Sequence, residues 1–253
     1  MSKSKKLGII IPARYESSRL PGKPLIKICG ITMIERTWMQ CCKAIDKSNI
    51  YIATDNIEIA KHVESFGGNF VMTSKKCLTG TDRIAEANKK LNLDLIINVQ
   101  GDEPMIDPND IKAVIQKKED NYNKVINCYC KLTSSDDPND INLPKVTFNE
   151  KKELIYMSRL PIPGIKNSSL SRPIYYKQVC IYAFNREELE AFQSYTSKSE
   201  IECMEDIEIL RFLEFDKKIL MIKTNKSSLS VDIIEDIDKV EDMMRKQDRN
   251  VLK

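Results

Sequence analysis

The chain contains 253 residues, of which 42% are hydrophobic and 30% are charged, so it can bury the core of one large α/β domain, with or without a small appendage. Its 40 basic and 37 acidic residues leave a formal net charge of +3, which argues against general nucleic-acid binding. No apolar run approaches the roughly 18 residues needed to span a membrane. The basic start leads into an apolar stretch too short for a secretory signal, and we therefore expect a cytoplasmic protein.

The first 124 residues alternate apolar runs with amphipathic segments. Apolar runs predict buried strands at residues 7–12, 50–54, 69–72 and 93–99. Helices are expected at residues 31–44, 56–66 and 82–91, and a further one begins at Asp107-Pro108. Asp55 is placed to cap the second helix, which Gly67-Gly68 ends. This alternation with short links predicts a doubly wound, mainly parallel sheet covered by helices.

The pattern changes after residue 124, where short strands follow one another. Residues 124–131, 145–148 and 154–159 are expected to be strands, the last two forming an antiparallel hairpin. A Ser-rich loop with flanking prolines at residues 161–173 is typical of a lid or a dimer contact. The rest predicts a strand at 179–184, a helix capped by Asn185, a helix from Ser199 to about residue 215, a strand at 218–224 and a helix at 231–246. We expect one domain over residues 1–253, with a distinct subregion at about 125–190.

Cysteine and histidine leave few options for catalysis. The eight cysteines include no Cys-x-x-Cys pair, so we expect buried free thiols in a reducing compartment. His62 is the sole histidine, which excludes a two-histidine metal site. It falls within a predicted helix, where we expect it to be solvated or half-packed. Catalysis is therefore expected to rest on carboxylates, cations and a metal ion.

A basic loop follows the first strand and carries Arg14, Arg19 and Lys23. Ligands of open α/β sheets bind outside the carboxyl ends of the strands, and guanidinium and ammonium groups suit a triphosphate. A P-loop is excluded because Gly22-Lys23 is followed by Pro24 rather than Ser or Thr. A solvated basic loop remains the alternative.

Two aspartates follow other predicted strands. Asp102 comes just after the strand at 93–99, beside Gln100, whose amide could read a base edge. A carboxylate there suits Mg²⁺, although it could instead satisfy turn amides. Asp232 begins the last predicted helix, where an N-cap completed by Glu235 is its simplest role. Together, Asp102 and Asp232 facing the basic loop are the minimum for metal-assisted nucleotidyl transfer.

Several short motifs stand in a fixed order along the chain. They are Ile11-Pro12-Ala13-Arg14-Tyr15, Ser18-Arg19-Leu20-Pro21-Gly22-Lys23-Pro24-Leu25, Ala53-Thr54-Asp55, Thr79-Gly80-Thr81-Asp82-Arg83, Asn98-Val99-Gln100-Gly101-Asp102-Glu103-Pro104 and, less densely, Lys145-Val146, Tyr156-Met157-Ser158-Arg159, Ile181-Tyr182-Ala183 and Val231-Asp232. In these motifs the whole chain resembles the 3-deoxy-manno-octulosonate (Kdo) cytidylyltransferases, the CMP-Kdo synthetases. Sialic-acid cytidylyltransferases carry a different, Gly-Ser-rich loop after Pro-Ala-Arg.

The resemblance implies a Rossmann-like nucleotidyltransferase fold, a homodimer, and Mg²⁺-dependent transfer of CMP from CTP to an acidic keto-sugar for bacterial surface polysaccharide. Residues 125–190 would serve sugar binding and dimerisation. The implied roles are nucleotide binding by Ala13, Arg14, Arg19, Lys23, Arg83 and Gln100, metal binding by Asp102 and Asp232, and sugar binding by Arg159, Gln178, Tyr182, Glu205 and Glu208. Lys23, Arg14 and Arg19 would also neutralise the departing pyrophosphate, beside the metal-binding aspartates.

Departures from the family pattern fall in the part of the chain that the resemblance assigns to sugar binding, the sugar half. The family's His-x-Gly-Ile-Tyr begins here with Gln178, and a glutamine of its Leu-Glu-Gln-Leu-Arg is Ile209. Loss of a buried hydrogen bond to a sugar hydroxyl would cost about 1–3 kcal/mol. We therefore hypothesise that the preferred sugar differs from plain Kdo, for instance an amino-substituted relative. The alternatives are activation of a nonulosonic, sialic-type acid, and a non-catalytic nucleotide-binding homologue.

Overall fold

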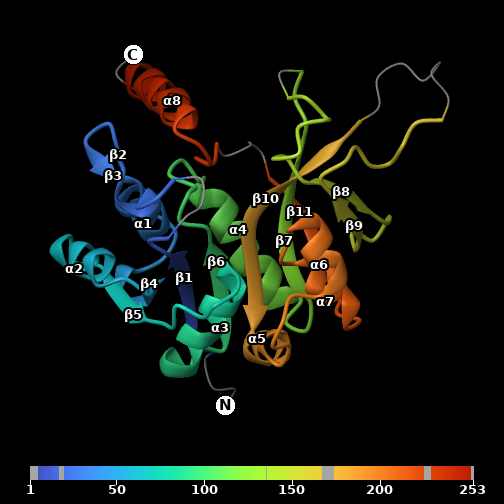
Figure 1. Ribbon diagram of the computed structural model, residues 1–253, viewed down its shortest axis with the longest axis horizontal. Coiled ribbons are helices and arrows are strands. Elements are labelled where there is room, and N and C mark those ends of the chain that lie inside the picture. Colours follow the sequence, from blue (N-terminus) through green and yellow to red (C-terminus); the bar gives the residue numbers. More distant parts are fainter. Residues whose placement is uncertain (1–4, 17–19, 135, 167–173, 225–228, 252–253) are drawn as a thin grey trace.

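A computed structural model describes residues 5–16, 20–134, 136–166, 174–224 and 229–251, with backbone only from residue 247. Its main sheet has the strand order β11-β7-β10-β6-β1-β4-β5 (Figure 1). The strands are β1 (Leu7–Ala13), β4 (Ile50–Thr54), β5 (Asn69–Met72), β6 (Leu95–Val99), β7 (Val125–Lys131), β10 (Tyr176–Asn185) and β11 (Ile219–Lys223). Within this path β10 pairs antiparallel with both neighbours, whereas the other pairings are parallel.

Two antiparallel hairpins accompany this sheet. The strands β8 (Lys145–Phe148) and β9 (Leu154–Ser158) pair with each other, and β8 joins β10, which confirms the hairpin expected after residue 124. A second hairpin, β2 (Lys27–Ile28) with β3 (Ile31–Thr32), stands apart. The expected first helix is therefore shorter than predicted, because its first two residues belong to β3.

Helices cover both faces of the sheet, as the sequence predicts. One face packs against α3 (Gly80–Leu91), α5 (Arg186–Gln193) and α7 (Leu210–Glu214). The other packs against α1 (Met33–Cys42), α2 (Ile57–Ser65) and α4 (Pro108–Asp120). The apolar side chains of β1 divide between these layers, since Ile10 joins the first and Ile9 and Ile11 join the second.

A third, smaller apolar cluster joins α8 (Glu235–Val251) to the β2–β3 hairpin (Figure 1). Ile28 and Met33 pack there with Val231 and Val240. This contact fixes the segment that carries Asp232 against the segment that carries Lys23, although the two are remote in the sequence. Among the described residues no helix is long and apolar enough to cross a bilayer.

Several helix boundaries differ from the predictions. Asn56, not Asp55, caps α2, because its side chain accepts hydrogen bonds from two backbone N–H groups of the first turn. The helix predicted from Ser199 has its capping box but ends at Asp206, whose φ of 48° divides it into α6 (Glu200–Glu205) and α7. The last helix begins at Glu235, and its Asp236 carboxylate accepts the N–H groups of Asp232 and Ile233.

The single histidine and the cysteines have structural surroundings. His62 is half-buried on α2 and contacts the hydroxyl of Thr32 at 2.7 Å. All eight cysteines are free thiols, as expected, but of these only Cys41, Cys128 and Cys130 are buried, whereas Cys29 and Cys203 are exposed.

Candidate active site

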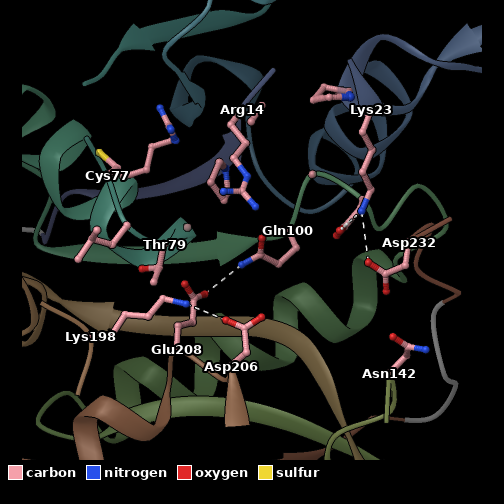
Figure 2. A pocket seen from close by; sticks show the side chains of 18 of the residues that line it. Arg14, Lys23, Cys77, Thr79, Gln100, Asn142, Lys198, Asp206, Glu208 and Asp232 are labelled. Atoms are coloured by element: carbon pink, nitrogen blue, oxygen red, sulfur yellow. Dashed lines mark hydrogen bonds and ion pairs between the residues drawn. The ribbon is translucent and has the colours of Figure 1, made fainter. Parts of the chain in front are cut away.

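A cavity of about 590 Å³ opens at the carboxyl ends of β1 and β6 (Figure 2). This is the edge at which open α/β sheets bind ligands. Its walls come from the ends of both strands, the start of α3, the loop before β8, the end of β9 and residues 198–208. The lining residues are Pro12, Ala13, Arg14, Lys23, Pro24, Cys77, Leu78, Thr79, Gly80, Arg83, Gln100, Gly101, Asp102, Ile141, Asn142, Arg159, Lys198, Asp206, Glu208 and Asp232.

The side chains of Lys23 and Asp232 meet at one end of the cavity (Figure 2). Asp102 lines the same cavity and contacts Lys23. The Lys23 Nζ atom lies 2.7 Å from Asp102 Oδ2 and 3.5 Å from Asp232 Oδ1. Burial alone would lower the pKa of Lys23, but the two carboxylates outweigh it and the pKa is raised. The backbone N–H of Val231 also donates to the Asp102 carbonyl at 3.0 Å. The two aspartates predicted as partners are thus brought together.

This pair of carboxylates fits a divalent cation. The Lys23 ammonium group already occupies a position that both carboxylates share, and carboxylate oxygens are the ligands that Mg²⁺ prefers. The described residues include no group of three or more His, Cys, Asp and Glu side chains placed around a metal position. A cation here would therefore complete its coordination with oxygens of substrate or water, as Mg²⁺ commonly does.

Arg83 lies on α3 and is held rigidly against the cavity. Only 3% of it is exposed, and its guanidinium donates to Thr73 Oγ1 at 2.6 Å and to Asp55 Oδ2 at 2.8 Å. Asp55 therefore orients Arg83 instead of capping α2. Thr79, whose side chain caps α3, lies in the same wall. The start of α3 thus presents a fixed cation to the cavity.

Gln100 and Glu208 lie side by side where the start of α3 faces residues 198–208 (Figure 2). Gln100 Nε2 donates to Glu208 Oε1 at 3.2 Å, and the Thr81 N–H donates to Glu208 Oε2 at 3.0 Å. A Cβ at Gly80 would lie 3.3 Å from Gln100 Nε2, so glycine permits this close approach. Burial raises the pKa of Glu208, although the hydrogen bonds from Thr81 oppose the shift. Glu208 therefore connects the two sides of the cavity.

Of the predicted sugar-binding residues, Arg159 and Glu208 line the cavity. The Arg159 guanidinium donates to the carbonyl oxygens of Glu205 at 2.5 Å, Ile141 at 2.7 Å and Asp206 at 2.9 Å. These backbone acceptors hold the side chain in one orientation. Of the other predicted residues, Ala13 and Arg14 line the cavity, and Arg19 lies outside the described residues.

Four residues of the expected sugar half lie outside the cavity lining. Gln178 Nε2 donates to Asn127 Oδ1 at 3.2 Å and to the Tyr182 hydroxyl at 3.1 Å, and Tyr182 is 4% exposed. The Glu205 carboxylate accepts the Arg159 N–H at 2.8 Å and so supports Arg159 from behind. Ile209 is 1% exposed in the apolar core. The expectation that Ile209 leaves a sugar hydroxyl unpaired is therefore wrong, because this position packs against hydrocarbon.

Sequence reasoning missed Lys198, Asp206 and Asn142. Lys198 Nζ lies 2.7 Å from Asp206 Oδ1, and all three residues line the cavity opposite Arg14 and Lys23 (Figure 2). Asp206 reaches this place because its backbone adopts the left-handed conformation that ends α6. No periodicity or motif signals that conformation at an aspartate, whereas Asn142 lies in a loop with no pattern of its own.

Comparison with known proteins agrees with this geometry. Residues 8–219 match the family model described as cytidylyltransferase. The 3-deoxy-manno-octulosonate cytidylyltransferase of Escherichia coli is 34% identical over 242 residues, covering 96% of this chain and 97% of the relative. The 8-amino-3,8-dideoxy-manno-octulosonate cytidylyltransferase of Shewanella baltica (strain OS185) is 38% identical, covering 92% and 96%.

Solved structures show the same relationship. A CMP:2-keto-3-deoxy-manno-octonic acid synthetase complexed with CTP superposes with a TM-score of 0.88 at 33% identity, covering 96% of this chain and 99% of the other. A 4-diphosphocytidyl-2C-methyl-D-erythritol synthase from Anaerococcus prevotii, at 19% identity and a TM-score of 0.62, shares the fold. The mixed sheet between two helical layers is the Rossmann-like nucleotidyltransferase fold, and the chain belongs to the cytidylyltransferase family.

Proposed function

We propose that this enzyme transfers a cytidylyl group from CTP to the anomeric hydroxyl of 3-deoxy-manno-octulosonate or a close variant of it, and releases pyrophosphate. The observation that carries the proposal is the junction of Lys23, Asp102 and Asp232 in a cavity that also presents Arg14, Arg83 and Arg159. Such a site offers cations to a triphosphate and to a sugar carboxylate, together with two carboxylates for a metal.

The charges of both substrates explain this composition. A triphosphate and a sugar acid repel each other, and in a site of low dielectric the repulsion amounts to several kcal/mol. Arg14 and Lys23 would bind the phosphate oxygens, whereas Arg159, on another wall, would bind the carboxylate. Arg159 is already oriented by backbone carbonyls, so little ordering remains to be done on binding.

Asp102 and Asp232 would hold Mg²⁺. Such an ion would supply positive charge close to the reacting phosphate and would lower the pKa of the attacking hydroxyl. Lys23 would leave the two carboxylates for the triphosphate, with which an ammonium group can pair as well. No histidine base is required, in agreement with the remote position of His62 on α2.

Gln100 suits the reading of cytosine. Its Nε2 donates to Glu208 at 3.2 Å, so its Oε1 would be the acceptor offered to a base. Cytosine presents an exocyclic amino group as a donor, whereas uracil presents a carbonyl oxygen in the same place. The Glu208 carboxylate therefore favours CTP over UTP through the orientation of the Gln100 amide.

The acceptor class includes amino-substituted Kdo. Relatives named for Kdo and for its 8-amino analogue match this chain at similar identity. The Asp206 carboxylate lines the cavity and pairs there with Lys198 at 2.7 Å, so an ammonium group on the sugar would share this carboxylate with Lys198 or replace Lys198. We keep the 8-amino analogue as the second candidate acceptor.

We also propose that the enzyme works as a homodimer in the cytoplasm, where it supplies lipopolysaccharide or capsule synthesis. Residues 125–190 would form the dimer contact, because Ile155 on β9 and Leu160 after it are 60% and 67% exposed. Sedimentation velocity tests this: the wild-type protein is expected to dimerise, and Leu160→Asp to shift it toward monomers. A monomeric wild-type protein would contradict the dimer.

A pyrophosphate-release assay tests the reaction itself. The four nucleoside triphosphates are each combined with Kdo, 8-amino-Kdo and a sialic acid, with and without Mg²⁺. We expect release only with CTP, Mg²⁺ and an eight-carbon acid. Release with the sialic acid alone would favour a nonulosonic substrate, and CTP binding without release from any acid would indicate a non-catalytic homologue.

A further inference from the structure

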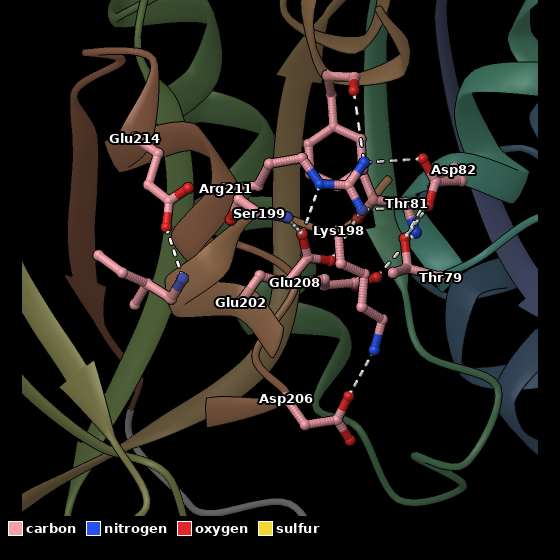
Figure 3. Close-up of polar contacts among 12 residues, drawn as sticks. Thr79, Thr81, Asp82, Lys198, Ser199, Glu202, Asp206, Glu208, Arg211 and Glu214 are labelled. Atoms are coloured by element: carbon pink, nitrogen blue, oxygen red, sulfur yellow. Dashed lines mark hydrogen bonds and ion pairs between the residues drawn. The ribbon is translucent and has the colours of Figure 1, made fainter. Parts of the chain in front are cut away.

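Arg211 is a fully buried cation that does not line the cavity (Figure 3). Its Nε and Nη2 donate to the two carboxylate oxygens of Glu202 at 2.6 and 2.8 Å. Nη1 and Nη2 donate to the two carboxylate oxygens of Asp82 at 3.0 and 3.4 Å, and Nη1 also donates to the Phe192 carbonyl at 3.4 Å. All five N–H donors of a guanidinium group are therefore used.

These partners come from three other helices. Glu202 lies on α6, Asp82 in the first turn of α3, and Phe192 on α5, where its ring centroid lies 3.8 Å from Arg211 Cζ. Arg211 itself lies on α7. One buried charge thus joins the helix that begins the nucleotide side of the cavity to the helices that carry the opposite side.

Short chains of contacts lead from Arg211 to the cavity on both sides. On one side, Asp82 Oδ2 also accepts the hydroxyl of Thr79 at 2.8 Å, and Thr79 lines the cavity. On the other, the Arg211 N–H donates to the Glu208 carbonyl at 3.2 Å, and the Glu208 carboxylate accepts from Thr81 N–H and Gln100 Nε2. The two sides of the cavity therefore contact each other at the Glu208 carboxylate, and Arg211 is bonded to residues on both sides of this contact.

We propose that Arg211 is a positioning residue for the cytidylyl transfer inferred above, on which this inference rests. It holds the nucleotide wall, residues 79–83, at a fixed distance from the sugar wall, residues 198–208. Glu208 then keeps Gln100 oriented toward the base while Arg159 and Asp206 stay in place for the acid sugar. Asp82 transmits the effect to the nucleotide wall, and Glu202 transmits it to the sugar wall.

Arginine is required for this arrangement. A lysine has three donors at a single point, so it cannot bind two carboxylates through two pairs of bonds each. Arg211→Lys keeps the buried positive charge but loses the planar guanidinium group. This variant therefore tests the positioning role of Arg211 while the charge balance of the cluster stays the same. Its matched control is Lys118→Arg, the reverse exchange at another buried ion pair. Lys118 is 0% exposed, lies 2.6 Å from Glu188 and does not line the cavity.

The experiment compares steady-state kinetics and hydrogen–deuterium exchange of these variants in the full chain. Arg211→Lys is expected to lower kcat/KM about 10- to 100-fold through displaced walls, whereas Lys118→Arg changes it less than about threefold at a similar loss of Tm. Asp82→Asn is expected to raise the KM for CTP more than that for the acid sugar, and Glu202→Gln to do the reverse. Amide exchange in residues 79–83 and 198–208 is expected to quicken in Arg211→Lys and to stay unchanged in the control.

Equal kinetics and equal exchange in Arg211→Lys and Lys118→Arg would overturn the positioning role. If Arg211→Lys does not fold, the KM values of Asp82→Asn and Glu202→Gln test the positioning role instead. The same pattern of KM changes for CTP and for the acid sugar in both variants would overturn that role. If the wild-type protein releases no pyrophosphate, the proposed function fails. The exchange rates and the calorimetric Kd for CTP still decide whether Arg211 sets the two walls.

Discussion

Asp102 and Asp232 are joined through one ammonium group: Lys23 Nζ lies 2.7 Å from the first and 3.5 Å from the second. Their side chains are 30% and 29% exposed, so both are open to the cavity. The three groups together carry one net negative charge. The site therefore attracts a further cation. The strand ends and α8 hold the three side chains in place.

Neutralising either aspartate is expected to remove most of the activity. Asp102→Asn and Asp232→Asn keep the side-chain volume but lose the charge that binds a divalent ion, and kcat is expected to fall about 100- to 1,000-fold. Asp107→Asn is the matched control, since this N-cap of α4 lies outside the cavity lining and asparagine caps equally well. Pyrophosphate release measures all three. Full activity in Asp102→Asn would contradict the metal site.

Magnesium is expected to stabilise the protein even without substrates. At a concentration about 100 times its Kd, the ion should raise Tm by about 5–10 °C. Lys23→Met removes the ammonium group that separates the carboxylates, so this variant should have a lower Tm in EDTA and a larger rise with Mg²⁺. Differential scanning fluorimetry in EDTA and Mg²⁺ tests both statements, and an equal rise in Asp102→Asn would count against them.

Glu208→Gln is expected to lower activity without lowering the stability of the protein at pH 8. Because burial raises the pKa of Glu208 above its ordinary 4.5, its contribution to stability is full below that value and is lost as pH rises through the folded-state pKa. At pH 8 the neutral glutamine should therefore leave Tm unchanged or higher. It cannot accept from both Thr81 and Gln100, so kcat/KM with CTP should fall about tenfold.

Glu208→Gln also tests whether Glu208 contributes to the selection of cytosine over uracil. Free rotation of the Gln100 amide should narrow the preference for CTP over UTP. Thermal melts from pH 5 to 9 and competition between the two nucleotides provide the readouts. A destabilised variant with unchanged nucleotide preference would contradict the assignment.

Arg159 is expected to determine the KM for the acid sugar. Arg159→Lys loses the planar group that three backbone carbonyls orient, and the KM for Kdo should rise about tenfold while the KM for CTP stays within twofold. Arg186→Lys serves as the control, because Arg186 pairs with Asp94 outside the cavity lining. A rise confined to the KM for CTP would place the sugar on another wall.

The sequence predicts those parts of the site that follow buried strands. β1 and β6 are recognisable as apolar runs, so the convergence of the basic loop with Asp102 follows from parallel topology. Asp232 could be added because it also follows a predicted strand. These predictions hold because strand ends of one sheet meet at one edge.

The remainder depends on tertiary contacts that carry no local pattern. Asp55 orients Arg83, Lys198 pairs with Asp206, and Gln178 bonds to Asn127. Each contact joins side chains from separate elements, and the antiparallel insertion of β10 between β6 and β7 determines which elements are neighbours. Hydrophobic periodicity does not encode that order, so sugar-side assignments made from motifs alone include residues that lie outside the cavity lining.

Anomalous diffraction from crystals grown with Mn²⁺ and CTP tests the central claim most directly. We predict an anomalous peak within coordination distance of both Asp102 and Asp232, with Lys23 moved onto the phosphates. A manganese ion bound to only one of the aspartates, or elsewhere in the molecule while Lys23 still joins the pair, would contradict the account.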